Sequence, residues 1–288
     1  MKKCLKKTNI AGLSLIAALI MVSCNKDENT TDRSDDEPIT ASELKASDEA
    51  ELVSDEILGI AEDLYSEDEI SASSKEGFRS DYLPECVTIT TVITDTSKEK
   101  TIDFGAGCEL PNGNGISGTI YLSYAKDMEM ASKTLRISLE DFTFNGVSVV
   151  GGATVIRQRS NENGNPQSNA DWAFDGLWPN GDAFSFSGNR IREWVEGYAS
   201  GFWGDNVFLI TGKGTFTGRL GNVLAKEILT PLRREWSCRF IVSGSMLISR
   251  NDAGVTLDFG EGDCDGKGLL IYADGTTKEI YLRRFLND

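Results

Sequence analysis

Residues 81–288 consist of short runs in which apolar and polar positions alternate, separated by turn-forming dipeptides. Alternation places apolar side chains on one face of a β-strand, and Asn-Gly or Asp-Gly between two such runs is the strongest local sign of a tight hairpin. The dipeptides are Asn112-Gly113, Asn145-Gly146, Asn180-Gly181 and Asp274-Gly275. The predicted strands cover residues 87–94, 100–104, 116–124, 134–144, 147–158, 183–193, 207–216, 222–230, 238–248, 255–259, 268–273 and 277–285. We therefore predict an all-β fold, a large antiparallel meander that forms either a sandwich or a curved, partly open barrel.

A different period precedes this domain, in residues 39–80. Within residues 48–65 the apolar positions recur every three to four residues, at Val53, Ile57, Ile60 and Leu64. This spacing predicts one short amphipathic helix, and Thr40-Ala-Ser-Glu43 just before it has the form of a capping box. We expect the apolar stripe to pack on the β-domain, the alternative being a separate partner-binding helix. Residues 66–80, rich in Ser, are predicted to be a linker.

Two pairs of cysteines enclose similar β-rich segments, Cys86 with Cys108 and Cys238 with Cys264. Residues equally distant from a hairpin turn face each other, and the midpoints of the two pairs are Ser97 and Asn251, each in a turn-like segment. The spacing therefore predicts disulfides 86–108 and 238–264, worth ~3 kcal/mol each in the chain-entropy model, with free buried thiols as the alternative.

The two enclosed segments also share the triplet Asp-Phe-Gly before the second cysteine. We interpret them as halves of an internal duplication, in which residues 115–122 correspond to residues 274–282. Glycine bulges are expected near residues 105–107 and 260–262, where mirror register would otherwise oppose glycines to apolar residues.

The first 38 residues have the features of an export signal and a tether rather than of a folded domain. Residues 1–23 combine four lysines with an apolar stretch too short for a ~20-residue membrane span, which is typical of a signal peptide of the lipoprotein type. Cleavage would leave Cys24 as a lipidated N-terminus, and residues 24–38 as an acidic tether. Ordinary secretion with cleavage elsewhere is the alternative. Asn25-Lys-Asp-Glu28 is similar to the export signal of surface-exposed lipoproteins in the Bacteroidota, which implies an outer-membrane anchor with the protein facing the cell exterior.

Charge narrows the choice of partners. Without residues 1–23, which hold four of the 29 basic and none of the 45 acidic residues, the net charge is −20. Nucleic acid is excluded as a partner, because phosphate binding needs clustered Lys and Arg. Residues 25–80 hold 18 acidic and 5 basic residues, so we expect most of the acidic excess to lie in this N-terminal stalk rather than in the β-domain.

Several segments, in their order along the chain, carry a resemblance. They are Thr101-Ile-Asp-Phe-Gly-Ala-Gly-Cys108, Arg192-Glu-Trp-Val-Glu-Gly197, Ile210-Thr-Gly212, Thr230-Pro-Leu232 and Ser237-Cys-Arg-Phe-Ile-Val-Ser-Gly244. Together they resemble a family of uncharacterised Bacteroidota surface lipoproteins with duplicated cysteine hairpins. The resemblance covers almost the whole mature chain, and it implies location and fold while leaving the activity open.

Candidate catalytic chemistry is sparse. The chain has no histidine, which excludes Ser-His-Asp and Cys-His catalysis and His-containing zinc sites. With the cysteines oxidised or lipidated, thiolate chemistry is excluded too, so we expect no enzyme, no cofactor and no metal. A carboxylate pair such as Asp171 and Asp175 would be needed for glycoside hydrolysis. The oxygen-rich loops at residues 161–165 and 263–266 have the composition of turns rather than the spacing of an EF-hand calcium loop.

Aromatic residues gather between residues 172 and 203, with acids and amides among them. Trp172, Trp178 and Trp203 could form a platform for sugar rings, while the alternative is that most of these aromatics fill the core. Our prediction is a cell-envelope lipoprotein that acts as a non-catalytic binding or structural protein, with a glycan or a protein as candidate ligand. The alternatives are a glycan-binding module, a carrier of a lipid or other apolar ligand, and a carboxylate-dependent glycoside hydrolase.

Overall fold

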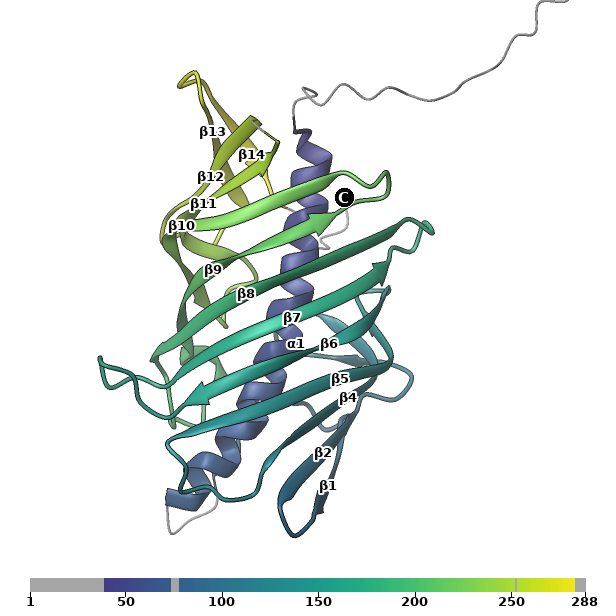
Figure 1. The fold of residues 1–288 in the computed structure, drawn as a ribbon, viewed down its shortest axis with the longest axis vertical. Coiled ribbons are helices and arrows are strands. Elements are labelled where there is room, and N and C mark those ends of the chain that lie inside the picture. The colour runs from purple at the N-terminus through teal and green to yellow at the C-terminus, as the bar shows by residue number, and fades with distance from the viewer. Residues whose placement is uncertain (1–38, 74–77, 252, 283–288) are drawn as a thin grey trace, which may run out of the picture. The chain divides into compact units, whose positions relative to one another are not determined.

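A computed structural model of the chain describes residues 39–73, 78–251 and 253–282, all within one unit, Asp36–Asp288. One long helix, α1 (Ala41–Ser73), precedes a single antiparallel sheet (Figure 1). The strands are β1 (Thr88–Ile93), β2 (Ser97–Asp103), β3 (Cys108–Glu109), β4 (Gly115–Ala125), β5 (Ser132–Phe144), β6 (Val147–Gln158), β7 (Gln167–Leu177), β8 (Ala183–Glu196), β9 (Val207–Thr217), β10 (Val223–Glu235), β11 (Ile241–Arg250), β12 (Ala253–Glu261), β13 (Lys267–Tyr272) and β14 (Thr277–Tyr281), with a short 3-10 helix η1 (Trp203–Asp205) between β8 and β9.

The sheet is a meander in which each strand pairs with its sequence neighbour from β4 to β14. β1 pairs with β2, β2 pairs with β4, and the two-residue β3 also pairs with β4. The predicted all-β antiparallel meander is confirmed, and so is the N-terminal helix. Tight turns explain the connectivity: between β5 and β6 both Asn145 and Gly146 have positive φ, 47° and 81°, as a two-residue type I′ hairpin requires.

One long strand was not predicted. β7 places small side chains, Ser168, Ala170 and Gly176, at inward positions, so its core-facing side does not look apolar in the sequence. The inward face is completed by Phe174 and by Trp172, a candidate residue for the sugar platform.

The helix is nearly twice as long as predicted, and the linker prediction for residues 66–80 is wrong up to Ser73, where α1 ends. Its start agrees with the sequence: Glu43 N–H donates to Thr40 Oγ1 at 3.3 Å, and Thr40 N–H donates to Glu43 Oε2 at 3.0 Å, which is a capping box. The predicted apolar stripe is buried against the sheet.

Helix α1 crosses the strands rather than following them (Figure 1). Glu43 near its start pairs with Arg250 on β11, and Asp68 near its end pairs with Lys100 on β2 at 3.1 Å. The stretch of helix between the two acids rises about 38 Å. The eight strand spacings from β2 to β11 also span about 38 Å. The helix is therefore long enough to cover nine consecutive strands.

Both predicted disulfides are present. The Cα atoms of Cys86 and Cys108 lie 6.0 Å apart, and those of Cys238 and Cys264 lie 5.7 Å apart. In the second hairpin Ser243 and Ser245 pair with Glu261 and Asp258, so one extra residue bulges out of β12 next to the predicted glycines.

The turn of the first hairpin lies slightly before the predicted midpoint, Ser97. Residues 104–107 form a turn between β2 and β3, so more residues separate the hairpin turn from Cys108 than from Cys86. The predicted equivalence of residues 115–122 and 274–282 is not reflected in the pairing. β4 pairs with the second strand of its cysteine hairpin, whereas β14 pairs with β13.

Candidate functional site

The two faces of the sheet differ in what covers them. The inner face packs on α1, and every residue from Leu52 to Ser66 is buried except Asp55, which is half-buried. The outer face of the strands carries the exposed side chains of the alternating pattern. The outer face is therefore the face of the sheet that α1 leaves uncovered.

Acidic side chains of the helix meet basic side chains of the sheet across the inner face. Arg190 on β8 is 3% exposed and bridges Glu51 and Asp55 of α1. Lys226 on β10 lies 2.9 Å from Glu51, and Arg157 on β6 lies 3.3 Å from Glu69. Burial of such charges is tolerated only when they are paired, so these residues serve the fold. The acidic excess counted in residues 25–80 is thus partly neutralised inside the domain, which corrects its assignment to a stalk.

A second polar cluster closes the inner face near the start of β4. Glu56 of α1 accepts hydrogen bonds from Asn112 Nδ2 at 2.9 Å, Asn114 Nδ2 at 3.0 Å and the Tyr82 hydroxyl. Burial, together with the charge of Glu56, raises the pKa of Tyr82 well above its usual range. Both carboxylate oxygens of Glu56 therefore accept hydrogen bonds from members of the cluster.

Asp63 is the buried helix carboxyl whose titration is most displaced. Burial raises the pKa of Asp63 to about 7, against the opposing effect of a hydrogen bond with Ser80. The carboxyl faces the interior beside α1, at 5% exposure. The titration of Asp63 therefore affects the stability of the fold and is not part of a surface binding site.

The predicted aromatic platform is not assembled. Trp172 on β7 is buried on the inner face, with the Arg190 guanidinium 4.7 Å from its ring centroid. Trp178 stacks on Phe184 at the β7–β8 turn, with ring centroids 4.4 Å apart. Trp203 lies in η1 at the opposite end of β8, and its ring centroid is 5.7 Å from that of Tyr82. Trp172 is part of the core, as the alternative to the platform predicts. Trp178 and Trp203 are half-buried and lie at different ends of the sheet.

The candidate carboxylate pair is on the outer face. Asp171 and Asp175 both lie on β7 and both are exposed. Four residues along a strand separate their Cα atoms by about 13 Å. Because both side chains leave the same face in the same direction, their carboxyl groups are farther apart than the about 5–9.5 Å that glycosidases use.

The loops considered for calcium are organised as turns. Asn161 Oδ1 accepts the backbone N–H groups of Asn163 and Asn165, whose side-chain amides donate to Glu193 Oε1. In the part of the chain that the structure describes, no group of three or more His, Cys, Asp or Glu side chains is arranged to hold a metal ion. The described helices include none with the length and apolar character needed to cross a membrane. Residues 1–23, Cys24 and the tether 24–38 lie outside the described residues.

Strand register aligns the outward side chains of β5 to β11 into rows that run across the strands. Arg136 pairs with Thr154, Thr154 with Asp171, and so on to Leu247. We call this the polar row: Arg136, Thr154, Asp171, Asn189, Lys213, Glu227 and Leu247. The next row, two residues away on each strand, is the small-residue row: Ser138, Gly152, Ala173, Ser187, Thr215, Ala225 and Ser249.

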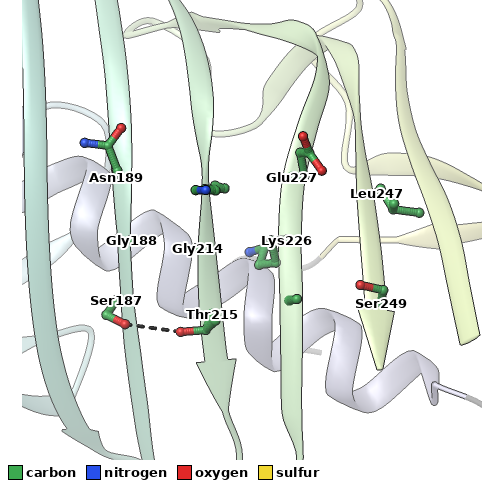
Figure 2. Close-up of a pocket in the computed structure, with 11 residues that line it drawn as sticks. Ser187, Gly188, Asn189, Gly214, Thr215, Lys226, Glu227, Leu247 and Ser249 are labelled. Atoms are coloured by element: carbon green, nitrogen blue, oxygen red, sulfur yellow. Dashed lines mark hydrogen bonds between the residues drawn. The ribbon is translucent and has the colours of Figure 1, made fainter. Parts of the chain in front are cut away.

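Two hollows lie along these two rows, and we call the strip of surface that holds both the transverse groove. One hollow of about 480 Å³ lies over β5–β7 and is lined by Arg136, Gly152, Thr154, Asp171 and Ala173 among others. A second, of about 400 Å³, lies over β8–β11. Figure 2 shows the second hollow, with Asn189, Glu227 and Leu247 in one row and Ser187, Thr215 and Ser249 in the other. Asn189 Nδ2 donates to Asp171 Oδ1 at 3.0 Å where the hollows adjoin.

Small side chains keep the floor of the groove low. At Gly152 a Cβ atom would lie 2.4 Å from the carbonyl oxygen of Ile137, so no side chain rises at that position. Ser187 and Thr215 hydrogen-bond to each other at 3.1 Å and lie along the floor (Figure 2). Lys226, which the second hollow also touches, points toward the helix.

The charges of the polar row differ from those of the inner face. Among the described residues, Arg136, Lys213 and Glu227 form no ion pair, although all three are exposed. Two of the row's side chains are basic and two are acidic. Sequence reasoning did not find this groove, because alternation shows which residues face outward but not which ones lie side by side on neighbouring strands.

Comparisons of the chain with protein-family models, with curated proteins and with solved structures find no match.

Proposed function

We propose that this protein is a lipid-anchored component of the cell envelope that faces the cell exterior and acts by binding, without catalysis. The anchor is the lipid on Cys24, and the binding surface is the outer face of the sheet. The proposal joins the lipoprotein-type leader and the resemblance to Bacteroidota surface lipoproteins with the arrangement of the described domain.

The observation that carries the proposal is the occupied inner face. The helix covers the inner face, where a carrier of apolar ligands would need a cavity, and the hollow between α1 and β7–β11 has only about 20 Å³. A hollow of that size holds about one water molecule. The outer face, in contrast, is not covered by α1 and carries the two open hollows of the transverse groove.

The same arrangement weighs against the remaining alternatives. Asp171 and Asp175 are too far apart to act as the carboxylate pair of a glycoside hydrolase. Trp172, Trp178 and Trp203 lie too far from one another to form one sugar-binding platform. Binding at the outer face needs neither a catalytic pair nor an aromatic cluster.

Fractionation of cells that express Cys24→Ala tests the anchor. We expect the wild-type protein in the outer-membrane fraction, accessible to protease added to intact cells, and the variant in the soluble fraction. Cys4→Ala is the matched control, since Cys4 lies in the leader and should not affect anchoring. A Cys24→Ala protein that stays in the membrane would refute the lipid anchor.

The binding role is tested with the purified full-length protein in detergent, offered envelope polysaccharides and secreted proteins. Retention of a ligand by the wild type, reduced by Ala225→Trp in the groove, is the expected result. Release of cleaved products from a retained polymer would contradict the non-catalytic part of the proposal.

A further inference from the structure

We propose that the transverse groove binds one linear, uncharged glycan chain that lies across strands β5 to β11. This inference rests on the proposed binding function and adds the class of ligand, its direction and the residues that hold it. The ligand would contact the polar row along one side and lie on the small-residue row.

The dimensions of the groove fit a chain rather than a compact molecule. Its two hollows adjoin at β7 and β8, and the register of paired residues is unbroken from Arg136 to Leu247. Seven strands are crossed in six spacings, a length of about 29 Å. A monosaccharide or a small metabolite would leave most of this length empty.

The polar row offers both kinds of hydrogen-bonding group in alternation. Arg136 and Lys213 can only donate, and Asp171 and Glu227 can only accept when ionised. Asn189 offers its Oδ1 as an acceptor, because its Nδ2 already donates to Asn169 and Asp171. A sugar hydroxyl is at once a donor and an acceptor, so a glycan can hydrogen-bond to every side chain of this row except Leu247. The small-residue row provides a low floor on which the C–H faces of sugar rings can lie.

The balance of charge selects an uncharged chain. Arg136 and Lys213 are offset by Asp171 and Glu227 within one row, so the groove carries no net charge. A polyanion such as nucleic acid or a uronic-acid polymer would meet a carboxylate at every second charged position, and a polycation would meet a guanidinium or an amine. A neutral chain incurs neither repulsion.

The position of the groove argues against an extended peptide. Peptides that add to a sheet do so at an edge, where backbone N–H and C=O groups are unpaired. Here every strand from β5 to β11 has a partner on both sides, so the backbone groups are used and only side chains remain.

The test uses the purified full-length protein and calorimetric titration with neutral linear oligosaccharides of increasing length, from several linkage types. For a chain of the preferred linkage, affinity should rise with length until the chain spans both hollows. Ala225→Trp fills the hollow over β8–β11, and Ala173→Trp fills the one over β5–β7. Each should remove the gain in affinity from length, by about tenfold or more, which is the effect of losing one or two hydrogen bonds.

Two further variants control for general effects. Ala183→Trp places the same side chain on the same outer face, at an exposed position outside both rows, and should bind as the wild type does. Lys213→Ala combined with Glu227→Ala removes the polar contacts without filling the groove or changing the net charge, and should weaken binding of long chains by about tenfold. Near-ultraviolet circular dichroism confirms that each variant is folded.

The outcomes separate the inference from the function on which it rests. Neutral glycans that bind equally to the wild type, Ala225→Trp and Ala173→Trp would overturn the groove as their site. A charged polysaccharide or a protein that binds instead, and is blocked by Ala225→Trp, would overturn the ligand class and leave the binding function in place. If nothing in either set of ligands binds the wild-type protein, both are overturned.

Discussion

Arg190 shows how charge is accommodated between the helix and the sheet. Its guanidinium is enclosed by Glu51, Asp55 and the ring of Trp172, at 3% exposure. The two acids are four residues apart, so they project from the same face of α1. A shift of the helix by one residue would rotate both away from Arg190 and leave charges buried without partners, which costs several kcal/mol. The ion pairs therefore fix the position of the helix along the sheet.

The burial of Asp63, also on α1, predicts how the stability of the protein depends on pH. Its pKa is about 7 in the folded protein because of burial, whereas an unfolded aspartate titrates near 4. The folded state holds this proton more tightly, so the contribution to stability is complete below about pH 4 and is lost as pH rises to about 7. Asp63→Asn removes the titration, so its stability relative to the wild type should increase between pH 4 and pH 8, by up to about 4 kcal/mol.

Urea unfolding of both proteins at several pH values measures this difference. Other groups titrate in both proteins and cancel when one free energy of unfolding is subtracted from the other. A difference that stays constant from pH 4 to pH 8 would show that Asp63 is ionised at no cost in the folded state.

At the scale of elements, hairpins with well-marked turns and apolar inward faces were predictable, and β6 was predicted with its observed bounds. β7 was missed because its inward positions include Ser168, Ala170 and Gly176, which carry no apolar signal. The predicted helix is too short because the Ser-rich residues 66–73 resemble a linker in composition. The basic partners of the acids in this segment, Lys100 and Arg157, lie far away in the sequence. The transverse groove could not be predicted, because it depends on register across seven strands and a slip of one residue reverses a face.

The position of the first disulfide predicts how the edge strand β1 responds when the bond is removed. β1 is an edge strand whose side chains are mostly exposed, so it has few buried contacts apart from its pairing with β2. The bond between Cys86 and Cys108 ties the start of β1 to β3. Replacing both cysteines by Ser should therefore let β1 open locally, since local opening costs less than global unfolding. Hydrogen exchange should become faster in residues 88–93 and stay unchanged in β7 and β8.

The matched variant replaces Cys238 and Cys264 by Ser. This bond joins the segment before β11 to the segment after β12, inside the sheet rather than at its edge, and Cys238 is 2% exposed. Its loss should lower the global free energy of unfolding, by about 3.5 kcal/mol in the chain-entropy model. Equal exchange effects in the two variants would contradict the distinction between edge and interior.

At the scale of the whole domain, α1 and the sheet depend on each other. The sheet exposes a wide inner face of apolar residues with basic residues among them, and the helix supplies both the apolar and the acidic complement. Leu52, Val53, Ile57, Ile60 and Leu64 are at most 1% exposed. Each buried side chain of this kind contributes about 1.5–3 kcal/mol. Five of them together are comparable to the net stability of a typical domain.

Deletion of residues 39–80 should therefore prevent the sheet from reaching its native state, even though thirteen of its strands pair in a continuous path without the helix. We expect the truncated protein to bind the dye ANS and to lack a near-ultraviolet circular dichroism signal and a cooperative thermal transition. Adding a synthetic peptide of residues 39–80 should restore the transition, because the acids of α1 and the basic residues of the inner face remain complementary. Deletion of the predicted tether, residues 25–38, is the control and should leave the transition unchanged. A cooperative transition in the truncated protein without the peptide would show that the sheet is stable alone, and that α1 is an attached helix rather than half of the core.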